Sequence, residues 1–268
     1  MNNWGRVFFI YVNDKLNTVY GQTLSNHSEN CRALLEKFDP RYFDEKTRHL
    51  LFKAVDRHDE GKKDTFRIKT EANGTTHAKQ NNISRQTKGK KTELKQTGIL
   101  HESIQKPKLC YSFAGHRFRV TDNDPYISAL IRAHHEFSVE EINRARSQIS
   151  SPYLKNRFPN DLYLLCMVDQ IEAELAVKTI ERKDSVPRTF MEFSTQATDY
   201  TCRSFTVVPW PFATDAFDLA FEVFELSHDY LKNEDPKDIE KAFKDVPISG
   251  FKRDVRTIHL SGENGNEY

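Results

Sequence analysis

The stretch HDEGK, residues 58–62, closes an apolar helical run and decides how the chain is expected to fold. Apolar side chains recur at helical spacing over residues 45–57, which predicts a helix whose buried face ends at His58 and Asp59. A carboxylate on an inward face is costly unless something compensates its charge. A metal ion supplies that compensation, and imidazole and carboxylate are among its usual ligands. His58 and Asp59 are therefore candidate metal ligands.

Further side chains that can bind a metal ion lie on the inward faces of other predicted helices. His27 shares the apolar face of a helix that begins at Leu24, and Asp169 shares that of a helix over residues 161–180. The complete candidate set is His27, His58, Asp59, His116, His134, His135 and Asp169. Apart from Asp59 and His116, each member has apolar neighbours at helical spacing that direct it inward.

The adjacent pair His134 and His135 lies at a predicted corner between two helices. The helical run that contains Ile127 and Leu130 is expected to end near residue 136. Ser138 with Glu141 three residues later has the form of a capping box, which starts the next helix. Both imidazoles are thus expected where one helix has just ended.

No member of the set is decisive alone, because a single buried histidine is more often a hydrogen-bonded core residue than a ligand. The ordered combination of five histidines and two aspartates is more specific, and it predicts a metal centre in a helical pocket. His101 is the main competitor for the role of His116.

The overall charge gives no reason to expect nucleic-acid binding, since the net charge is +1 and the pI is about 7.7. Residues 69–108 are different: they are polar and carry nine lysines and arginines against three glutamates. They are expected to form a flexible basic insertion. This insertion is either a solvated loop or an arm that attracts a polyanion.

Cysteine spacing and hydropathy bear on the compartment. The four cysteines are far apart and show no Cys-x-x-Cys spacing, so they are expected to be free thiols in a reducing compartment. The apolar run over residues 7–12 predicts a leading strand and is far shorter than the roughly 20 residues of a membrane span. A cytoplasmic location without membrane contact is expected. Residues 204–210 and 217–226 predict a small β-rich element near the end of the chain.

This order of motifs resembles the HD superfamily of metal-dependent phosphohydrolases, and within it is most similar to the CRISPR-associated HD nuclease of type I systems. The resemblance covers roughly residues 5–180 and rests on His27, on HDEGK, and on FAGHRF at 113–118, LIRAHH at 130–135 and MVDQ at 167–170. It implies a mainly α fold, an HD-domain helical bundle with a short N-terminal strand, over residues 1–200. Residues 201–268 would form a β-rich C-terminal extension packed on this domain.

The resemblance also implies a division of the ligands between two divalent ions, which could be Mn, Ni, Fe, Co or Mg. One ion would be held by His27, His58, Asp59 and Asp169, and the other by Asp59, His116, His134 and His135. Asp59 would bridge the two ions. Lys62 would approach the substrate phosphate as a second catalytic group. The alternative for Lys62 is a surface lysine that serves solubility.

The chain has no Gly-x-x-x-x-Gly-Lys-Ser/Thr motif, so it resembles the stand-alone form of that nuclease, which partners a separate CRISPR helicase and a guide-RNA surveillance complex. The implied activity is two-metal hydrolysis of single-stranded DNA in antiviral defence. Basic residues near the motifs are candidates for DNA contact: Lys62, Lys63, Arg117, Arg119 and Arg132.

Two other functions remain open. HD phosphodiesterases that act on small or cyclic nucleotides also use His-Asp-x-Gly-Lys and a paired histidine followed by glutamate, as Glu136 is here. The Gly-Tyr-Pro segment expected after those histidines is replaced by Phe137, Ser138 and Val139. The chain could also be a non-catalytic docking subunit, although such a module is expected to have lost some of the seven ligands.

Overall fold

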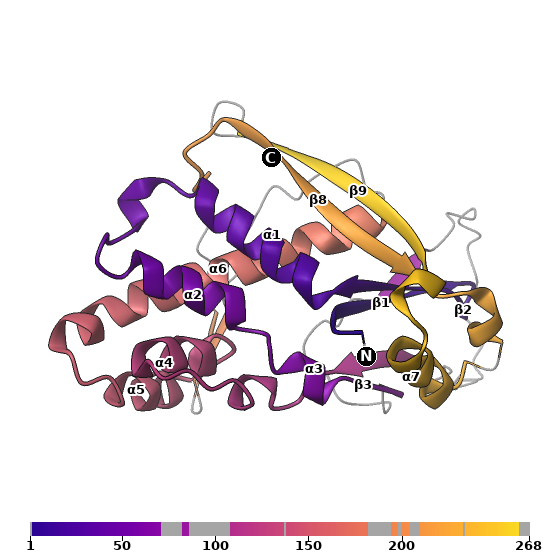
Figure 1. Cartoon of the computed structure of the whole chain (residues 1–268), viewed down its shortest axis with the longest axis horizontal. Coiled ribbons are helices and arrows are strands. Elements are labelled where there is room, and N and C mark those ends of the chain that lie inside the picture. Colours follow the sequence, from indigo (N-terminus) through magenta and orange to yellow (C-terminus); the bar gives the residue numbers. More distant parts are fainter. Residues whose placement is uncertain are drawn as a thin grey trace, which may run out of the picture.

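The architecture is mixed α/β, with a five-stranded sheet packed against a layer of helices (Figure 1). The computed structural model describes residues 2–70, 82–85, 108–136, 138–181, 194–197, 200–203, 210–232 and 234–262. The expectation of a mainly α fold was wrong. The prediction missed strands β2 (Lys15–Thr23) and β9 (Lys252–Ser261). Both contain many polar and charged side chains, so neither shows the continuous apolar run by which a strand was expected to be recognised.

The sheet begins with a hairpin of β1 (Trp4–Val12) and β2. Asn13 and Asp14 connect the strands and have φ angles of 50° and 59°. Two consecutive positive φ angles match the twist of a two-residue hairpin turn, and asparagine and aspartate tolerate them better than most residues. Every residue of β1 except the last is buried, because the strand lies in the middle of the molecule.

The strand order is β4-β1-β2-β8-β9, so both ends of the chain contribute to one sheet. Strand β4 (Asn82–Arg85) pairs parallel with β1, and β8 (Ala216–Glu225) pairs antiparallel with β9 along its whole length. Figure 1 shows β8 and β9 as a long antiparallel pair beside α1 and α6; β8 contacts both helices, and β9 contacts α6. The sheet therefore joins the two sides of the predicted domain boundary at residue 200.

The helical layer lies on one face of the sheet. Its members are α1 (Leu24–Lys37), α2 (Arg48–Arg57), α3 (Lys62–Thr65), α4 (Pro125–Ala133), α5 (Val139–Ser147) and α6 (Pro152–Glu181). The 30-residue α6 contacts α1, α2, α4 and α5. Ser138 caps α5 by accepting a hydrogen bond from the backbone N–H of Glu141 at 3.2 Å, which confirms the predicted corner after the paired histidines.

Alternation along β1 divides the core into two clusters. Phe8 and Ile10 pack with the helical layer, whereas Val7 and Phe9 pack on the opposite face with α7 (Pro236–Asp245). Arg6 lies on the same side of the strand as Phe8, so its side chain is directed into the helical layer. Arg6 is buried there, with 8% of its surface exposed.

The remaining elements are short. They are β3 (Arg67–Thr70), β5 (Leu109–Ser112), β6 (Ser194–Ala197), β7 (Tyr200–Arg203) and the 3-10 turns η1 (Pro40–Tyr42), η2 (His116–Phe118), η3 (His228–Leu231) and η4 (Ile248–Gly250). Strands β3 and β5 pair antiparallel, with Thr70 opposite Leu109. This pair closes the base of the long segment between α3 and η2, so η2 returns next to α3.

The structure contains several of the predicted elements. The predicted strand over 217–226 is confirmed as β8, and the predicted helix starting at Leu24 is confirmed as α1. Most of the expected insertion at 69–108, and residues 204–209, lie outside the described residues. Cys31, Cys110 and Cys166 are free. Within the described ranges, no helix has the length and apolar character needed to cross a bilayer.

Gly21 allows β2 to pass the aromatic core beneath the sheet. A Cβ atom at this position would overlap the Trp4 ring and lie 2.7 Å from Phe243 Cε1. Gly21→Ala should therefore lower the free energy of unfolding by about 1–3 kcal/mol, as overpacking does in other cores. Urea denaturation measures this, with Gly250→Ala as the comparison, since Gly250 is exposed and its Cβ would crowd a single carbon, Val246 Cγ1, instead of two aromatic rings of the core. Equal stability of the two variants would contradict the expectation.

Candidate metal centre

All seven predicted ligands converge in one place, although five separate segments supply them. His27 lies on α1, His58 and Asp59 follow α2, His116 begins η2, His134 and His135 follow α4, and Asp169 lies on α6. Six of the seven are buried, and His135 is half-buried.

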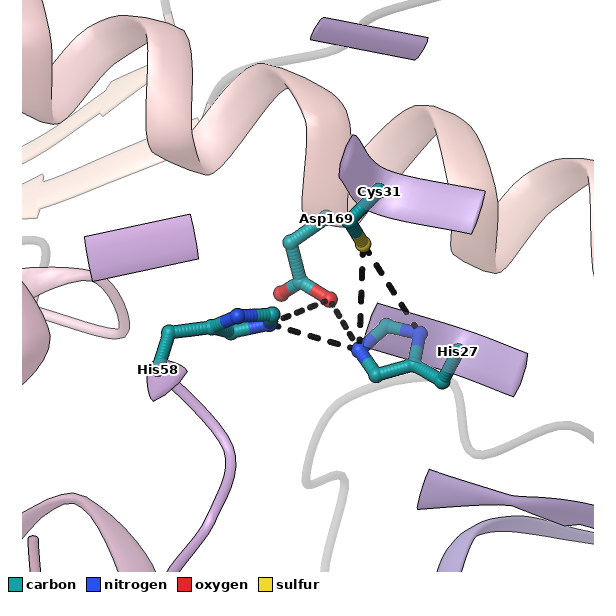
Figure 2. Close-up of side chains that lie close together, drawn as sticks. All are labelled: His27, Cys31, His58 and Asp169. Atoms are coloured by element: carbon teal, nitrogen blue, oxygen red, sulfur yellow. Dashed lines mark hydrogen bonds and ion pairs between the residues drawn. The ribbon is translucent and has the colours of Figure 1, made fainter. Parts of the chain in front are cut away.

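The ligand atoms form two groups, and the atoms within each lie within 4.8 Å of one another. One group is His27, Cys31, His58 and Asp169, and the other is Asp59, His116, His134 and His135. In the first group, Asp169 Oδ1 lies between the two imidazoles, 3.5 Å from His27 Nε2 and 3.9 Å from His58 Nε2 (Figure 2).

The carboxylate of Asp59 lies between the two groups. Its Oδ2 is 2.9 Å from His27 Nε2 and 3.5 Å from His58 Nε2. Its Oδ1 is 3.1 Å from His116 Nε2 and 3.7 Å from His134 Nε2. Each oxygen thus faces a different set of histidines, as in a carboxylate that bridges two metal ions.

Several of these buried atoms have no hydrogen-bond partner among the described residues. They are both side-chain oxygens of Asp59, of which Oδ2 does form an ion pair with Lys62, and the Nε2 atoms of His116 and His134. Most buried polar atoms in proteins are hydrogen-bonded, so a cluster of unpaired acceptors around one carboxylate needs another partner. Divalent ions bound through nitrogen and oxygen would satisfy all of them. The residues present therefore fit a metal centre, and these groups could hold metal ions.

The backbone sets which ring nitrogen three of the histidines present. His58 Nδ1 lies 2.6 Å from Val55 O, His116 Nδ1 lies 2.8 Å from Phe113 O, and His134 Nδ1 lies 2.6 Å from Ile131 O. A carbonyl can only accept, so each Nδ1 donates a proton to the carbonyl three residues earlier. His58 and His134 each cap the end of a helix, where such carbonyls are free. In the neutral ring, which is the form that binds a metal ion, each Nε2 is then left as an acceptor that faces Asp59.

Nearby charges keep the acidic groups ionised. Burial opposes ionisation of Asp59, but Lys62 and His58 hold the pKa of Asp59 well below its ordinary value. Burial likewise opposes ionisation of Asp169, but its contact with His58 and the charge of Arg6 hold its pKa well below the ordinary value. Burial and the neighbouring His134 hold the pKa of His135 well below its usual range. Buried carboxylates and a neutral imidazole are therefore available for a cation.

Lys62 begins α3 and is buried, with 6% of its surface exposed. It is therefore not a surface lysine that serves solubility. Its ammonium forms an ion pair with Asp59 Oδ2 and donates to the Gly5 carbonyl at 3.4 Å. It also lies 5.1 Å from the centre of the Phe113 ring. The ammonium is thus held at the candidate centre itself.

Gly61 allows α3 and η2 to meet beside Asp59. A Cβ atom at this position would overlap the His116 carbonyl oxygen and lie 2.8 Å from its carbonyl carbon. Any larger residue would push His116 away from Asp59. The close approach of the His116 backbone therefore explains why glycine occupies position 61 in HDEGK.

Three residues that contact the ligands were not predicted. Glu172 and Arg6 are buried, with Glu172 Oε2 2.6 Å from His27 Nδ1 and Arg6 Nη2 3.0 Å from Asp169 Oδ1. The spacing of Glu172 three residues after Asp169 placed it on the ligand face of α6 and could have identified it. Arg6 could not be found this way, because its partners are more than 160 residues away.

Cys31, the third unpredicted residue, follows His27 by one helical turn. Its Sγ lies 3.9 Å from both ring nitrogens of His27 and donates to Val168 O at 3.8 Å (Figure 2). An atom equally far from both nitrogens lies beside the ring and not along the lone pair of Nε2. Burial raises the pKa of Cys31 to about 11, so it remains a thiol. We infer that Cys31 packs against the ligand ring.

The predicted DNA-contact residues occupy two locations. Lys63 and Arg119 are exposed on α3 and at the end of η2, which are in contact. Arg117, also on η2, pairs with Glu136 at 2.7 Å. Arg132 is directed elsewhere and donates to Gln148 at 3.3 Å. His101, the competitor of His116, lies outside the described residues.

Comparison of the chain with protein-family models, curated proteins and solved structures found no match. The family suggested by the motifs therefore stays a prediction. Evidence on the function therefore comes from the chemistry of the site.

Asp59→Ala should weaken the binding of both ions, because it removes the only carboxylate that faces both groups of described ligands. We expect the apparent affinity for Mn²⁺ or Ni²⁺ to fall at least about 100-fold, more than loss of an outer-shell partner causes. Isothermal titration calorimetry measures this, with the exposed His49→Ala as control. Unchanged stoichiometry in Asp59→Ala would exclude the bridging role.

Proposed function

We propose that this chain is a metal-dependent deoxyribonuclease that cleaves single-stranded DNA by hydrolysis with two divalent ions. The observation that supports this most directly is the position of Asp59, whose two oxygens face two separate sets of buried histidines. Paired ions about 3.5–4 Å apart activate water and stabilise the leaving oxygen of a phosphate ester. Phosphodiester hydrolysis is therefore the reaction class that the site suits best.

The ligand set favours some ions over others. Five of the seven ligands are imidazoles, which suit Mn²⁺, Fe²⁺, Co²⁺ and Ni²⁺ better than Mg²⁺, an ion that prefers oxygen. We propose that transition-metal ions support activity better than Mg²⁺ does.

The residues of the chain have separate roles in this proposal. Asp59 would hold both ions, and Lys62, which pairs with Asp59 here, would be the cation placed to stabilise negative charge on the scissile phosphate. His135 is the least buried of the seven ligands, so the substrate would approach from its side.

The surface beside the centre suits a single strand. Phe118 is 61% exposed, although exposing so large an apolar side chain forgoes about 1.5–3 kcal/mol of burial. The Arg117 guanidinium lies 4.8 Å from the centre of its ring, and Arg119 is exposed next to it. Aromatic rings that stack on bases, together with cations that contact the backbone, are the usual means of binding unpaired nucleic acid.

The motif resemblance adds a biological setting to the proposal. In type I CRISPR interference, a helicase guided by an RNA surveillance complex would supply the unwound strand to this chain. These partners are proposed on the resemblance alone.

Circular single-stranded DNA tests the activity directly. We expect degradation of circles with Mn²⁺ or Ni²⁺, slower degradation with Mg²⁺, and none with chelator or in Asp59→Ala. Faster hydrolysis of a cyclic dinucleotide than of DNA would favour the phosphodiesterase instead. Full activity of Asp59→Ala would contradict the mechanism.

Lys62→Ala separates catalysis from metal binding. Because Lys62 would stabilise charge that develops on the phosphate, kcat should fall about 100- to 1000-fold while two ions still bind. The neighbouring Lys63 is exposed, so Lys63→Ala is the matched control and should change kcat only slightly. Similar kcat values for the two variants would rule out a catalytic role for Lys62.

Phe118→Ala tests the binding surface. Loss of one stacked base is worth about 1–3 kcal/mol, so KM for single-stranded DNA should rise roughly 5- to 150-fold. Hydrolysis of bis(p-nitrophenyl) phosphate, which has no base, should be unchanged, and Phe118→Trp should restore DNA binding. Tyr153→Ala, at another exposed aromatic residue, is the control. Equal loss on both substrates would mean that Phe118 only supports the fold.

A further inference from the structure

His27 cannot set its own tautomer as the other buried histidines do. It lies in the first turn of α1, which begins at Leu24. The free backbone groups at a helix start are N–H donors, whereas free carbonyl acceptors occur only at the helix end. His27 therefore needs an acceptor from another element if its Nε2 is to remain free.

Glu172 on α6 provides that acceptor. Its Oε2 lies 2.6 Å from His27 Nδ1, and the residue has no exposed surface. Both of its oxygens accept hydrogen bonds from other donors, so this contact holds a proton on His27 Nδ1 and directs Nε2 toward Asp59 Oδ2, 2.9 Å away.

Two donors hold Glu172 in this orientation. Gln22 Nε2 donates to Oε1 at 2.6 Å, and Arg6 Nε donates to Oε2 at 3.2 Å. The second arm of the Arg6 fork reaches Asp169 Oδ1 at 3.0 Å. One guanidinium from the sheet therefore links two carboxylates that lie three residues apart on α6.

We infer that Glu172 is a positioning residue that sets the tautomer and the direction of the His27 ring for metal binding, and that Arg6 keeps Glu172 and Asp169 aligned for it. The inference rests on the proposed function only in requiring a metal ion at the first group. Carboxylates that hold a ligand imidazole in this way commonly change metal affinity about 10- to 100-fold when they are lost.

Arg6 has a reason to be arginine and not lysine. Two buried carboxylates near each other disfavour ionisation of both, and Asp169 must be ionised to bind a cation. A planar guanidinium can donate to both carboxylates at once, whereas an ammonium on a flexible stem does not match this geometry. Arg6→Lys should therefore weaken metal binding about 10-fold while keeping the charge.

The test uses the full chain with Glu172→Ala and Glu172→Gln. Calorimetric titration with Ni²⁺ should show the first group binding about 10- to 100-fold more weakly in Glu172→Ala and about 10-fold more weakly in the isosteric Glu172→Gln. The ¹⁵N-histidine NMR spectrum of the zinc-loaded protein should show His27 with a proton on Nδ1 in the wild type. This signal should be weakened or lost in Glu172→Ala, while those of His58, His116 and His134 remain.

Asp161→Ala is the matched control, because Asp161 is a second buried carboxylate on α6. It is 1% exposed and bonds Tyr126 and Arg157, neither of which is a ligand. Its loss should lower the thermal midpoint without changing the affinity for Ni²⁺ or the His27 spectrum. An effect on metal binding as large as that of Glu172→Ala would mean that any buried charge on α6 acts in the same way, and would overturn the inference.

The outcomes separate this inference from the proposed function. Wild-type affinity and an unchanged His27 spectrum in both Glu172 variants would overturn the positioning role, even if the protein cleaves DNA. A wild-type protein that binds no ion would overturn the metal centre itself. If Glu172→Ala does not fold, Glu172→Gln decides, and unaltered binding in that variant would also overturn the inference.

Discussion

The buried carboxylate of Asp59 is the constraint on which the rest of the structure depends. It is fully enclosed, and among the described residues its Oδ2 has an ion pair with Lys62 while Oδ1 has no hydrogen-bond partner. Such a charge is stable only if cations gather around it. Histidines from α1, α2, η2 and α4 surround it, and Lys62 contacts it directly. The centre is thus the place where the helical segments meet, and its charge gives a reason for their convergence.

The sheet has a part in this centre beyond support. Strand β1 is buried on both faces, and its alternation sends Phe8 into the helical core and Arg6 to the carboxylates of α6. A buried guanidinium is tolerated there because both of its partners are ionised. The fold therefore couples the position of α6 to the sheet through the same side chain that neutralises the site.

Three of the histidines are oriented by local hydrogen bonds, and His27 is oriented by a residue distant in sequence. His58, His116 and His134 each donate to the carbonyl three residues earlier, so a short segment of chain determines which nitrogen they present. The adjoining sequence, an apolar helical run that ends in histidine, contains that information for His58 and His134. His27 depends on Glu172, 145 residues away, and no local pattern could predict this contact.

The sequence by itself indicated the seven candidate ligands as one set. Helical periodicity directs five of them inward whatever they meet there, and Asp59 and His116 were included because of the motifs around them. It also determined the capped corner after His135 and the strands β1 and β8. Only the tertiary structure decided the mixed α/β architecture, since polar strands such as β2 and β9 become recognisable through their partners. It likewise decided the burial of Lys62, the contact of Gly61 with His116 and the bonds of Arg6. These depend on segments distant in sequence, whose meeting no local pattern encodes.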